Sequence, residues 1–204
     1  MYRFFKNIVN TLIIFLAVIG LISIYKNHSL DGIFDGFSNA FSFDKEKTIE
    51  QVGDFSQVDK EFKIDKAINV MGYKTVVAKH QSSGQKMIIV DSGKKTVLTQ
   101  DDLTDENIKA KLEGFCQKCS NGSTEIESVK IIERGYMNTY GQRVPYVKID
   151  VKLTKLPNSN FVGIISVVED DINNKRIVIS MNDKNRYSHL ITTEFYKNIK
   201  DSKF

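Results

Sequence analysis

The chain has 204 residues, of which 41% are hydrophobic and 26% are charged, a balance typical of a folded protein and not of a disordered one. Its 29 basic and 25 acidic residues leave a net charge of +4, and residues 1–26 carry three of the basic residues and no acid. Without that segment 26 basic and 25 acidic residues remain, so the sequence predicts no nucleic-acid partner.

Residues 8–25 form the most hydrophobic segment of the chain. No charged residue lies between Asn7 and Tyr25, and a helix of that length covers roughly 27 Å, about the hydrocarbon thickness of a bilayer. The segment is longer than the apolar core of a signal peptide, and no small-residue cleavage site follows it. We therefore predict a cytoplasmic tail over residues 1–7 and a retained transmembrane helix over residues 8–25, with a cleaved signal peptide as the alternative.

The charges around this segment predict its orientation. Two basic residues precede it and one follows it, so the positive-inside rule places the N-terminus in the cytoplasm. The protein is then expected in the inner (cell) membrane as a single-pass protein, with its C-terminal domain periplasmic or extracellular. The N-terminal helix would be its contact with the membrane.

Residues 26–66 are predicted to form a Phe-rich linker before an exported domain of residues 67–204. The first part of the linker carries apolar residues at the spacing of one helix face: Leu30, Ile33, Phe34, Phe37 and Phe41. This amphipathic helix could pack on the chain's own core, lie in the membrane interface or contact another subunit. Farther on, Ser56 begins a capping-box pattern that predicts a second helix running through Phe62 toward Met71.

From Tyr73 onward, runs of β-branched and apolar residues predict strands, and two stretches with helical periodicity predict helices. In chain order we expect strands at residues 73–79 and 86–91, a helix at 101–118, strands at 126–134, 143–153, 162–170 and 175–181, and a helix at 183–199. The short connections favour antiparallel pairing. The predicted fold class is α+β, with an N-terminal transmembrane helix followed by one domain with a mainly antiparallel sheet packed by helices.

The element order ββ-α-ββββ-α over residues 73–204 resembles the PsbP-like fold, a sheet sandwiched by helices that recurs in bacterial envelope proteins. The resemblance also rests on the segments Glu133-Arg134-Gly135-Tyr136 and Gly141-Gln142-Arg143-Val144-Pro145, and on a terminal helix that ends in Phe195 and Ile199. The overall plan of tail, single span and exported domain is also similar to the assembly-factor subunits of type IV secretion systems. The PsbP-like resemblance implies an α/β/α sandwich, and neither resemblance assigns a functional residue.

The two cysteines, Cys116 and Cys119, form a CxxC pair. They lie at the C-terminal end of the predicted helix at 101–118, and a helix C-terminus does not lower a thiol pKa as a redox-active cysteine requires. In an exported domain the pair predicts a small structural disulfide, with free thiols and redox or metal chemistry as alternatives. The three histidines, His28, His80 and His189, show no ligand spacing, so no metal site is predicted.

Other patterns that carry chemistry are absent from the sequence or have simpler explanations. The acidic run Glu169-Asp170-Asp171 precedes two asparagines and predicts a turn between strands. No Gly-x-Ser-x-Gly elbow and no phosphate-binding glycine loop is present. We therefore predict neither a catalytic activity nor a cofactor.

A cluster of tyrosine and arginine residues surrounds the connection at residues 135–145, which we predict to be an exposed loop. Both residue types are enriched in protein-binding patches. The predicted contact residues are Arg134, Tyr136, Tyr140, Arg143 and Tyr146. The sequence thus favours a membrane-anchored envelope protein that binds a protein partner or supports assembly of a membrane complex. The alternatives are an exported redox or metal-binding protein that uses the CxxC pair, and a small-ligand-binding domain with a cleft between sheet and helix.

Overall fold

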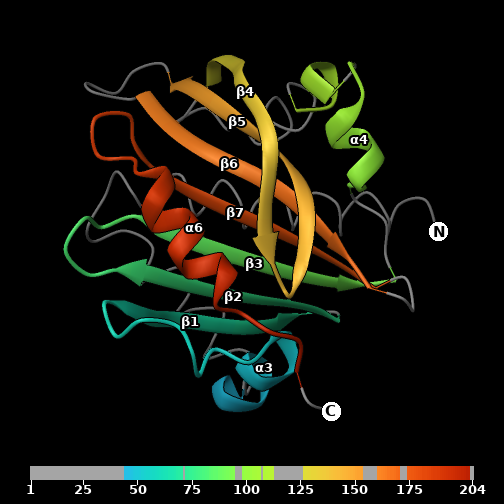
Figure 1. Cartoon of the computed structure of the whole chain (residues 1–204), viewed down its shortest axis with the longest axis vertical. Helices are drawn as coiled ribbons and strands as arrows, with labels where there is room; N and C mark the ends of the chain where they lie inside the picture. The colour runs from blue at the N-terminus through green and yellow to red at the C-terminus, as the bar shows by residue number, and fades with distance from the viewer. Residues whose placement is uncertain are drawn as a thin grey trace.

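The computed structural model describes residues 44–70, 72–94, 98–106, 108–112, 126–153, 160–170 and 174–202 (Figure 1). These residues form one seven-stranded sheet with short helices packed against it. The strands are β1 (Phe62–Val70), β2 (Tyr73–His80), β3 (Lys86–Gly93), β4 (Ile126–Thr139), β5 (Gln142–Leu153), β6 (Asn160–Glu169) and β7 (Lys175–Asp183). The helices are α3 (Lys45–Val52), α4 (Gln100–Thr104) and α6 (His189–Lys197), and residues 108–112 are also helical.

The strands lie in the order β1-β2-β3-β7-β6-β5-β4, and every neighbouring pair is antiparallel. The first three strands form one meander and the last four form another. The two meanders join where β3 pairs with β7 in the middle of the sheet. The connection between β3 and β4 therefore runs from a central strand to the strand at the far edge of the sheet.

Side chains alternate between the two faces of the sheet, and both faces are buried. On one face Ile88 and Ile179 belong to a cluster that includes Leu103 of α4. On the other face Ile89 and its neighbours pack against Phe195 of α6 and Val52 of α3. Because neither face of the central strands is exposed to solvent, their sequences are continuous apolar runs and do not alternate between apolar and polar residues.

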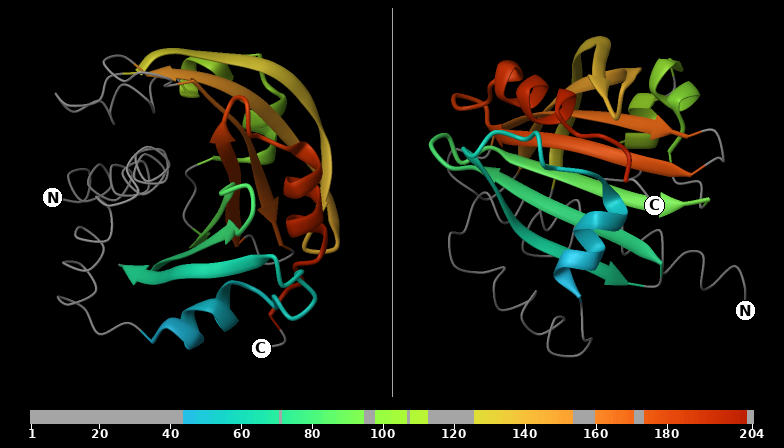
Figure 2. Two further views of the ribbon diagram at one scale, coloured as in Figure 1. Left: turned by 90° about the vertical axis from the view of Figure 1, so that its left-hand side faces the viewer. Right: turned by 60° about the horizontal axis from the view of Figure 1, so that its bottom comes forward.

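The sheet is strongly curved, and the β4–β5 hairpin bends over the face that carries α6 (Figure 2). Its tip reaches the opposite side of the domain, where the Tyr140 hydroxyl donates a hydrogen bond of 3.0 Å to the Val52 carbonyl at the end of α3. The C-terminal segment joins the same region, because Asp54 and Lys200 exchange two backbone hydrogen bonds. Three segments far apart in the sequence therefore meet at one end of this face.

The predicted fold class is wrong. The described domain is predominantly β, since its seven-stranded sheet outweighs helices of 8, 5 and 9 residues. Among the described residues, no helix is both long and apolar enough to cross a membrane. The predicted transmembrane segment at 8–25 and the Phe-rich stripe at 30–41 lie outside the described residues.

Three element predictions within the domain also need correction. The helix predicted at 101–118 is interrupted, because α4 ends at Thr104 and the described chain is helical again only at residues 108–112. The helix predicted to start at Ser56 is instead a turn followed by strand β1. Gly72, with a φ of 80°, lies between β1 and β2, so the chain turns back and β1 pairs along its length with β2. That pairing outweighs the local capping pattern. The closing helix begins at His189, not at residue 183, because Ser188 provides its N-cap.

Candidate functional site

The segment predicted to be an exposed binding loop is the end of the β4–β5 hairpin. Thr139 pairs with Gln142, which leaves a two-residue turn of Tyr140 and Gly141. Both turn residues have positive φ, 51° and 72°. Two consecutive left-handed residues match the twist of the flanking strands, so this turn type closes a hairpin without splaying it. The candidate contact residues are therefore held on paired strands.

Tyr136 and Arg143 form the exposed part of this hairpin. Tyr136 is 59% exposed, and the Arg143 guanidinium lies over its ring at 4.8 Å from the centroid. Tyr136 is paired with Pro145 and Arg143 with Asn138, so the two side chains are diagonal neighbours on adjacent strands. An exposed stack of this kind contributes about 0.5–1 kcal/mol. It holds two residues with many rotamers in one arrangement on the surface.

Arg134 already has a structural partner. Its Nη1 donates to the Thr104 carbonyl at 2.9 Å and its Nη2 to the Asp105 carbonyl at 3.2 Å. These carbonyls lie at the C-terminal end of α4, where a helix leaves acceptors without intrahelical donors. Arg134 thus fastens α4 to β4, and only part of its side chain is available to a partner.

Tyr140 and Tyr146, the other two predicted contact residues, lie in the core and not on the surface. Tyr140 is 3% exposed and Tyr146 is 5% exposed. The Tyr146 hydroxyl donates a hydrogen bond of 2.5 Å to the Glu133 carboxylate, and its ring lies against Gly135. A Cβ at Gly135 would lie 2.8 Å from that ring, so only glycine fits opposite this tyrosine.

The surroundings of these tyrosines change their acid–base behaviour. Burial and the hydrogen bond to the Glu133 carboxylate raise the pKa of Tyr146 to about 12. The same hydrogen bond, together with Lys148, lowers the pKa of Glu133. Burial raises the pKa of Tyr140 well above its ordinary value. Each phenol is therefore neutral at physiological pH and acts as a hydrogen-bond donor in the core.

The sequence indicated no partner for His80, yet both nitrogens of its ring lie within hydrogen-bond distance of another side chain. Its Nε2 lies 2.8 Å from the Glu61 carboxylate, and its Nδ1 lies 2.9 Å from the Ser83 hydroxyl. The sequence signal would have been the hairpin turn, which brings Ser83 back to His80. A serine, a histidine and a carboxylate in contact are the groups that a hydrolase uses for nucleophilic catalysis.

The backbone around Ser83 argues against nucleophilic catalysis. A hydrolase needs free N–H groups beside the nucleophile to bind the oxyanion. Here the Ser83 N–H donates to His80 Nδ1, and the Gly84 N–H donates to the His80 carbonyl. The Gln85 N–H donates to the Ser83 hydroxyl itself. These donors are used to close the turn, so the cluster stabilises the β2–β3 connection.

The other predicted sites have no structural counterpart in the described part of the chain. Cys116 and Cys119 lie outside it. In the part of the chain that is described, no group of three or more His, Cys, Asp or Glu side chains is arranged to hold a metal ion. The acidic run is used locally: the Asp170 carboxylate accepts hydrogen bonds from the backbone and side chain of Asn174, and Glu169 pairs with Lys175.

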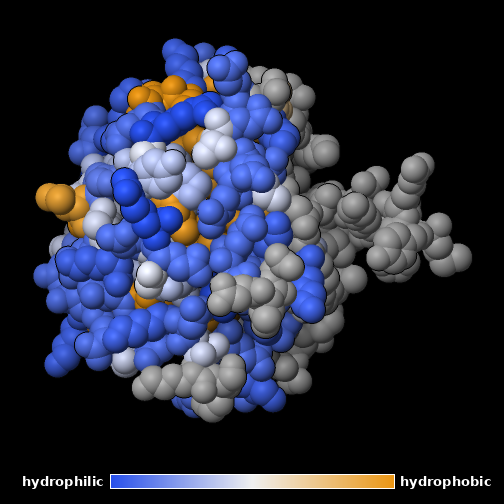
Figure 3. All heavy atoms as spheres, turned by 45° about the vertical axis from the view of Figure 1, so that its right-hand side comes forward, coloured by the Kyte–Doolittle hydropathy of each residue, from blue (hydrophilic) through white to orange (hydrophobic). Residues whose placement is uncertain are grey.

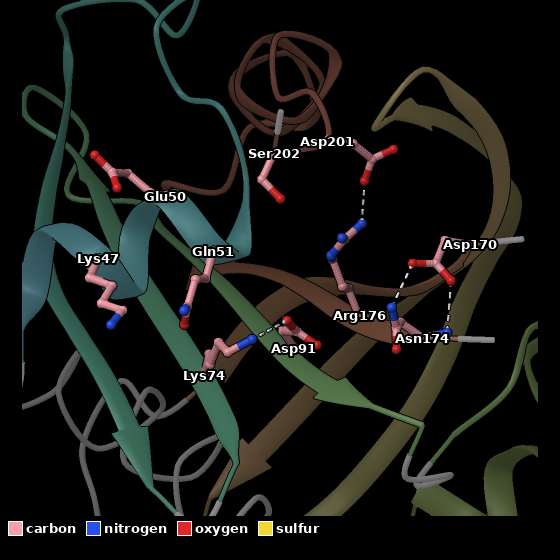
Figure 4. Close-up of a pocket in the computed structure, with 10 residues that line it drawn as sticks. All are labelled: Lys47, Glu50, Gln51, Lys74, Asp91, Asp170, Asn174, Arg176, Asp201 and Ser202. Carbon is pink, nitrogen blue, oxygen red and sulfur yellow. Dashed lines mark hydrogen bonds and ion pairs between the residues drawn. The ribbon is translucent and has the colours of Figure 1, made fainter. Parts of the chain in front are cut away.

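A second candidate site is a pocket of about 680 Å³ between α3, the sheet and the C-terminal segment (Figure 4). Its floor contains three charged side chains from adjacent strands. Lys74 of β2 is paired with Asp91 of β3, and Asp91 is paired with Arg176 of β7. Nothing in the sequence indicated this row, because the three residues are far apart along the chain.

Comparison with known proteins adds no assignment. No protein-family model matches the sequence, and no curated protein matches it. The resemblance to the PsbP-like fold stays a prediction from the sequence.

Proposed function

We propose that this protein is a binding protein, anchored at the cell membrane, that contacts a protein partner through the exposed end of the β4–β5 hairpin. The observation that carries the proposal is the stacked pair of Tyr136 and Arg143. The location at the membrane, with the described domain on its outer side, is proposed from the sequence.

The stacked pair has the properties of an interface anchor. Tyrosine and arginine are the residue types that most often dominate binding energy at protein interfaces. The pair sits on a tight hairpin, and holding the two side chains in place beforehand lowers the entropy lost on binding. On the face shown in Figure 3, hydrophobic residues reach the surface in small separate patches among hydrophilic ones. A few anchoring side chains therefore suit this surface better than a broad apolar contact.

Contact through side chains is favoured over addition of a strand to the edge of the sheet. β4 is the last strand in the sheet order, so its outer edge faces no other described strand. Its first half, however, carries the charged residues Glu127, Lys130 and Glu133 and two register shifts. Charges and bulges are the devices by which edge strands avoid pairing with another chain. The partner is therefore expected to contact the side chains of the hairpin end.

The test is co-purification after cross-linking of the full-length protein in its native membrane. Tyr136→Ala with Arg143→Ala is expected to lower the recovery of a specific cross-linked partner about thirtyfold, the effect of losing about 2 kcal/mol of binding energy. The matched control is Glu127→Ala with Lys152→Ala, which removes an exposed ion pair of 2.6 Å between the same two strands. The control is expected to retain the partner.

Both double variants should keep the melting temperature of the parent, since each removes exposed side chains. Equal recovery of the partner by the parent and by the Tyr136/Arg143 variant would refute the proposed surface. So would loss of the partner in the Glu127/Lys152 variant alone.

A further inference from the structure

The pocket beside α3 is bounded by a row of charges next to the apolar core. Lys74, Asp91 and Arg176 are directly opposite one another on β2, β3 and β7, so they project to the same face of the sheet. Two residues farther along these strands, the same face presents Val76, Ile89 and Val178, which are fully buried. Charged side chains beside an apolar core are costly unless they are paired.

Within the described residues, only some of the polar atoms in this row of charged side chains have close hydrogen-bond or ion-pair partners. Arg176 is 7% exposed; its Nη1 donates to the Asp201 carboxylate at 2.5 Å and its guanidinium lies 4.6 Å from the centre of the Tyr140 ring. Its buried Nε has no hydrogen-bond partner. Lys74 reaches Asp91 only at 3.5 Å. A buried donor without a partner on a charged group is costly, which favours a ligand that supplies an acceptor here.

The arrangement of charges indicates the chemistry of that acceptor. Lys74 and Arg176 project from the sheet and Asp201 from the C-terminal segment, whereas the Glu50 side chain of α3 points away from these three (Figure 4). The pocket lining holds three basic and four acidic residues: Lys47, Lys74 and Arg176 against Glu50, Asp91, Asp170 and Asp201. A ligand with several negative charges, such as phosphate, would be repelled by the acids. A ligand with one carboxylate and one ammonium group can pair with both the basic and the acidic residues of the lining.

We infer that this pocket binds a zwitterion, an amino acid or a short peptide. The ligand carboxylate contacts Arg176 and Lys74, since a guanidinium fork fits a carboxylate in two parallel hydrogen bonds. The ligand ammonium group contacts the Asp201 carboxylate, which also accepts a hydrogen bond from Arg176. The pocket volume of about 680 Å³ lies within the range of small-ligand sites and leaves room for more than a single amino acid.

The inference is tested on the full-length protein by titration calorimetry, with amide NMR shifts near Gly93 and Arg176 as a second readout. The probes are L-alanine, trialanine, acetate, methylammonium and inorganic phosphate. At least one zwitterion is expected to bind about tenfold more tightly than acetate, methylammonium or phosphate, and the ratio between alanine and trialanine distinguishes a free amino acid from a peptide. Equal affinity for acetate or phosphate, or no binding of either zwitterion, would overturn the inference.

Three variants locate the site. Arg176→Lys keeps the charge but removes the fork, and is expected to weaken zwitterion binding at least about tenfold. Because Arg176 is buried, Asp201→Asn on the half-exposed C-terminal segment provides a second test that does not disturb the core; it should reduce zwitterion affinity to that of acetate. Asp150→Asn, at the Lys184–Asp150 ion pair elsewhere on the sheet, is the control and should bind as the parent does. An unchanged preference for zwitterions in Asp201→Asn would contradict the assigned role of that residue and the inference with it.

Discussion

At the scale of the residue, Tyr140 shows how one side chain can close a turn and fill a core. Its backbone has a positive φ of 51°, and its side chain is buried between Val52 and Arg176. The ring also lies against Gly53, where a Cβ would be 3.1 Å from it. The tyrosine therefore links the hairpin tip to α3 and to the C-terminal segment.

This environment predicts two separable effects on stability. Tyr140→Phe leaves the buried Val52 carbonyl without its donor and should lower the free energy of unfolding by about 1–2 kcal/mol. Tyr140→Ala also removes the ring and should lower it by about 3–5 kcal/mol. Urea unfolding of both variants gives the two numbers. Tyr136→Ala, the exposed tyrosine of the same hairpin, is the control; a similar loss there would show that burial is not the cause.

At the scale of the element, one buried amide holds the N-terminal turn of helix α6 against the sheet. Gln85, just before β3, is fully buried. Its Oε1 accepts from the Ser188 N–H at 2.8 Å, and its Nε2 lies within 2.9 Å of the Ser188 carbonyl and the hydroxyls of Ser180 and Thr192. An amide nitrogen has two protons, so these acceptors share them. The N-terminal turn of α6 is held by this group.

We expect Gln85→Ala to lower the free energy of unfolding by about 3 kcal/mol, because several buried polar groups lose their partner at once. Amide hydrogen exchange should show the largest loss of protection in α6. Gln81→Ala is the matched control: Gln81 is an exposed glutamine of the same hairpin whose Nε2 donates only to the Lys60 carbonyl. If α6 keeps its protection in Gln85→Ala, the helix is held by its apolar contacts and by the Tyr196 hydrogen bonds to the Ile88 and Ile179 carbonyls.

At the scale of the whole molecule, the tyrosines with raised pKa values make the stability of the fold sensitive to alkaline pH. Burial raises the pKa of five described tyrosines: Tyr73, Tyr140, Tyr146, Tyr187 and Tyr196. The raised values of Tyr146 and Tyr187 reach about 12. In the unfolded chain a tyrosine ionises near pH 10.

The sign of the pH dependence follows from that difference. A raised folded-state pKa means that the native state prefers the neutral phenol, so its stabilising contribution is complete below about pH 10. It is lost as the pH rises from about 10 to 12, because the unfolded chain releases its phenol protons first. We expect the free energy of unfolding, measured in urea, to be lower at about pH 11 than at about pH 8. The tyrosinate absorbance should rise together with unfolding.

A matched variant separates this effect from general alkaline damage. Tyr146→Phe removes one of the raised groups, so the loss of stability between about pH 10 and 11 should be shallower than in the parent. An identical slope in parent and variant would contradict the assignment to Tyr146. Ionisation of all tyrosines near pH 10 in a protein that remains folded would contradict the account as a whole.

Local patterns in the sequence were sufficient for most of the strands. The apolar run around Met87–Val90 predicted a strand at 86–91, and β3 spans Lys86–Gly93. The run at 175–181 likewise lies within β7. Such segments are specified by their own side chains, because an apolar β-branched run has to be buried wherever it lies. Within the candidate contact surface, the same reasoning identified Tyr136 and Arg143 by residue type.

The sequence by itself therefore determined the positions of most strands and suggested the residue types of the proposed contact surface, but not which of those residues are exposed or which distant residues meet. Tyr140 and Tyr146 look like Tyr136 in sequence, but Tyr146 is paired with Gly135 and so points to the opposite face from Tyr136, and Tyr140 turns inward to Val52. The row of Lys74, Asp91 and Arg176 exists because β3 pairs with β7 in one particular register. A one-residue slip would send a strand's side chains to the opposite face. Register between strands so far apart depends on the packing of the whole core, so the pocket was decided by the tertiary structure alone.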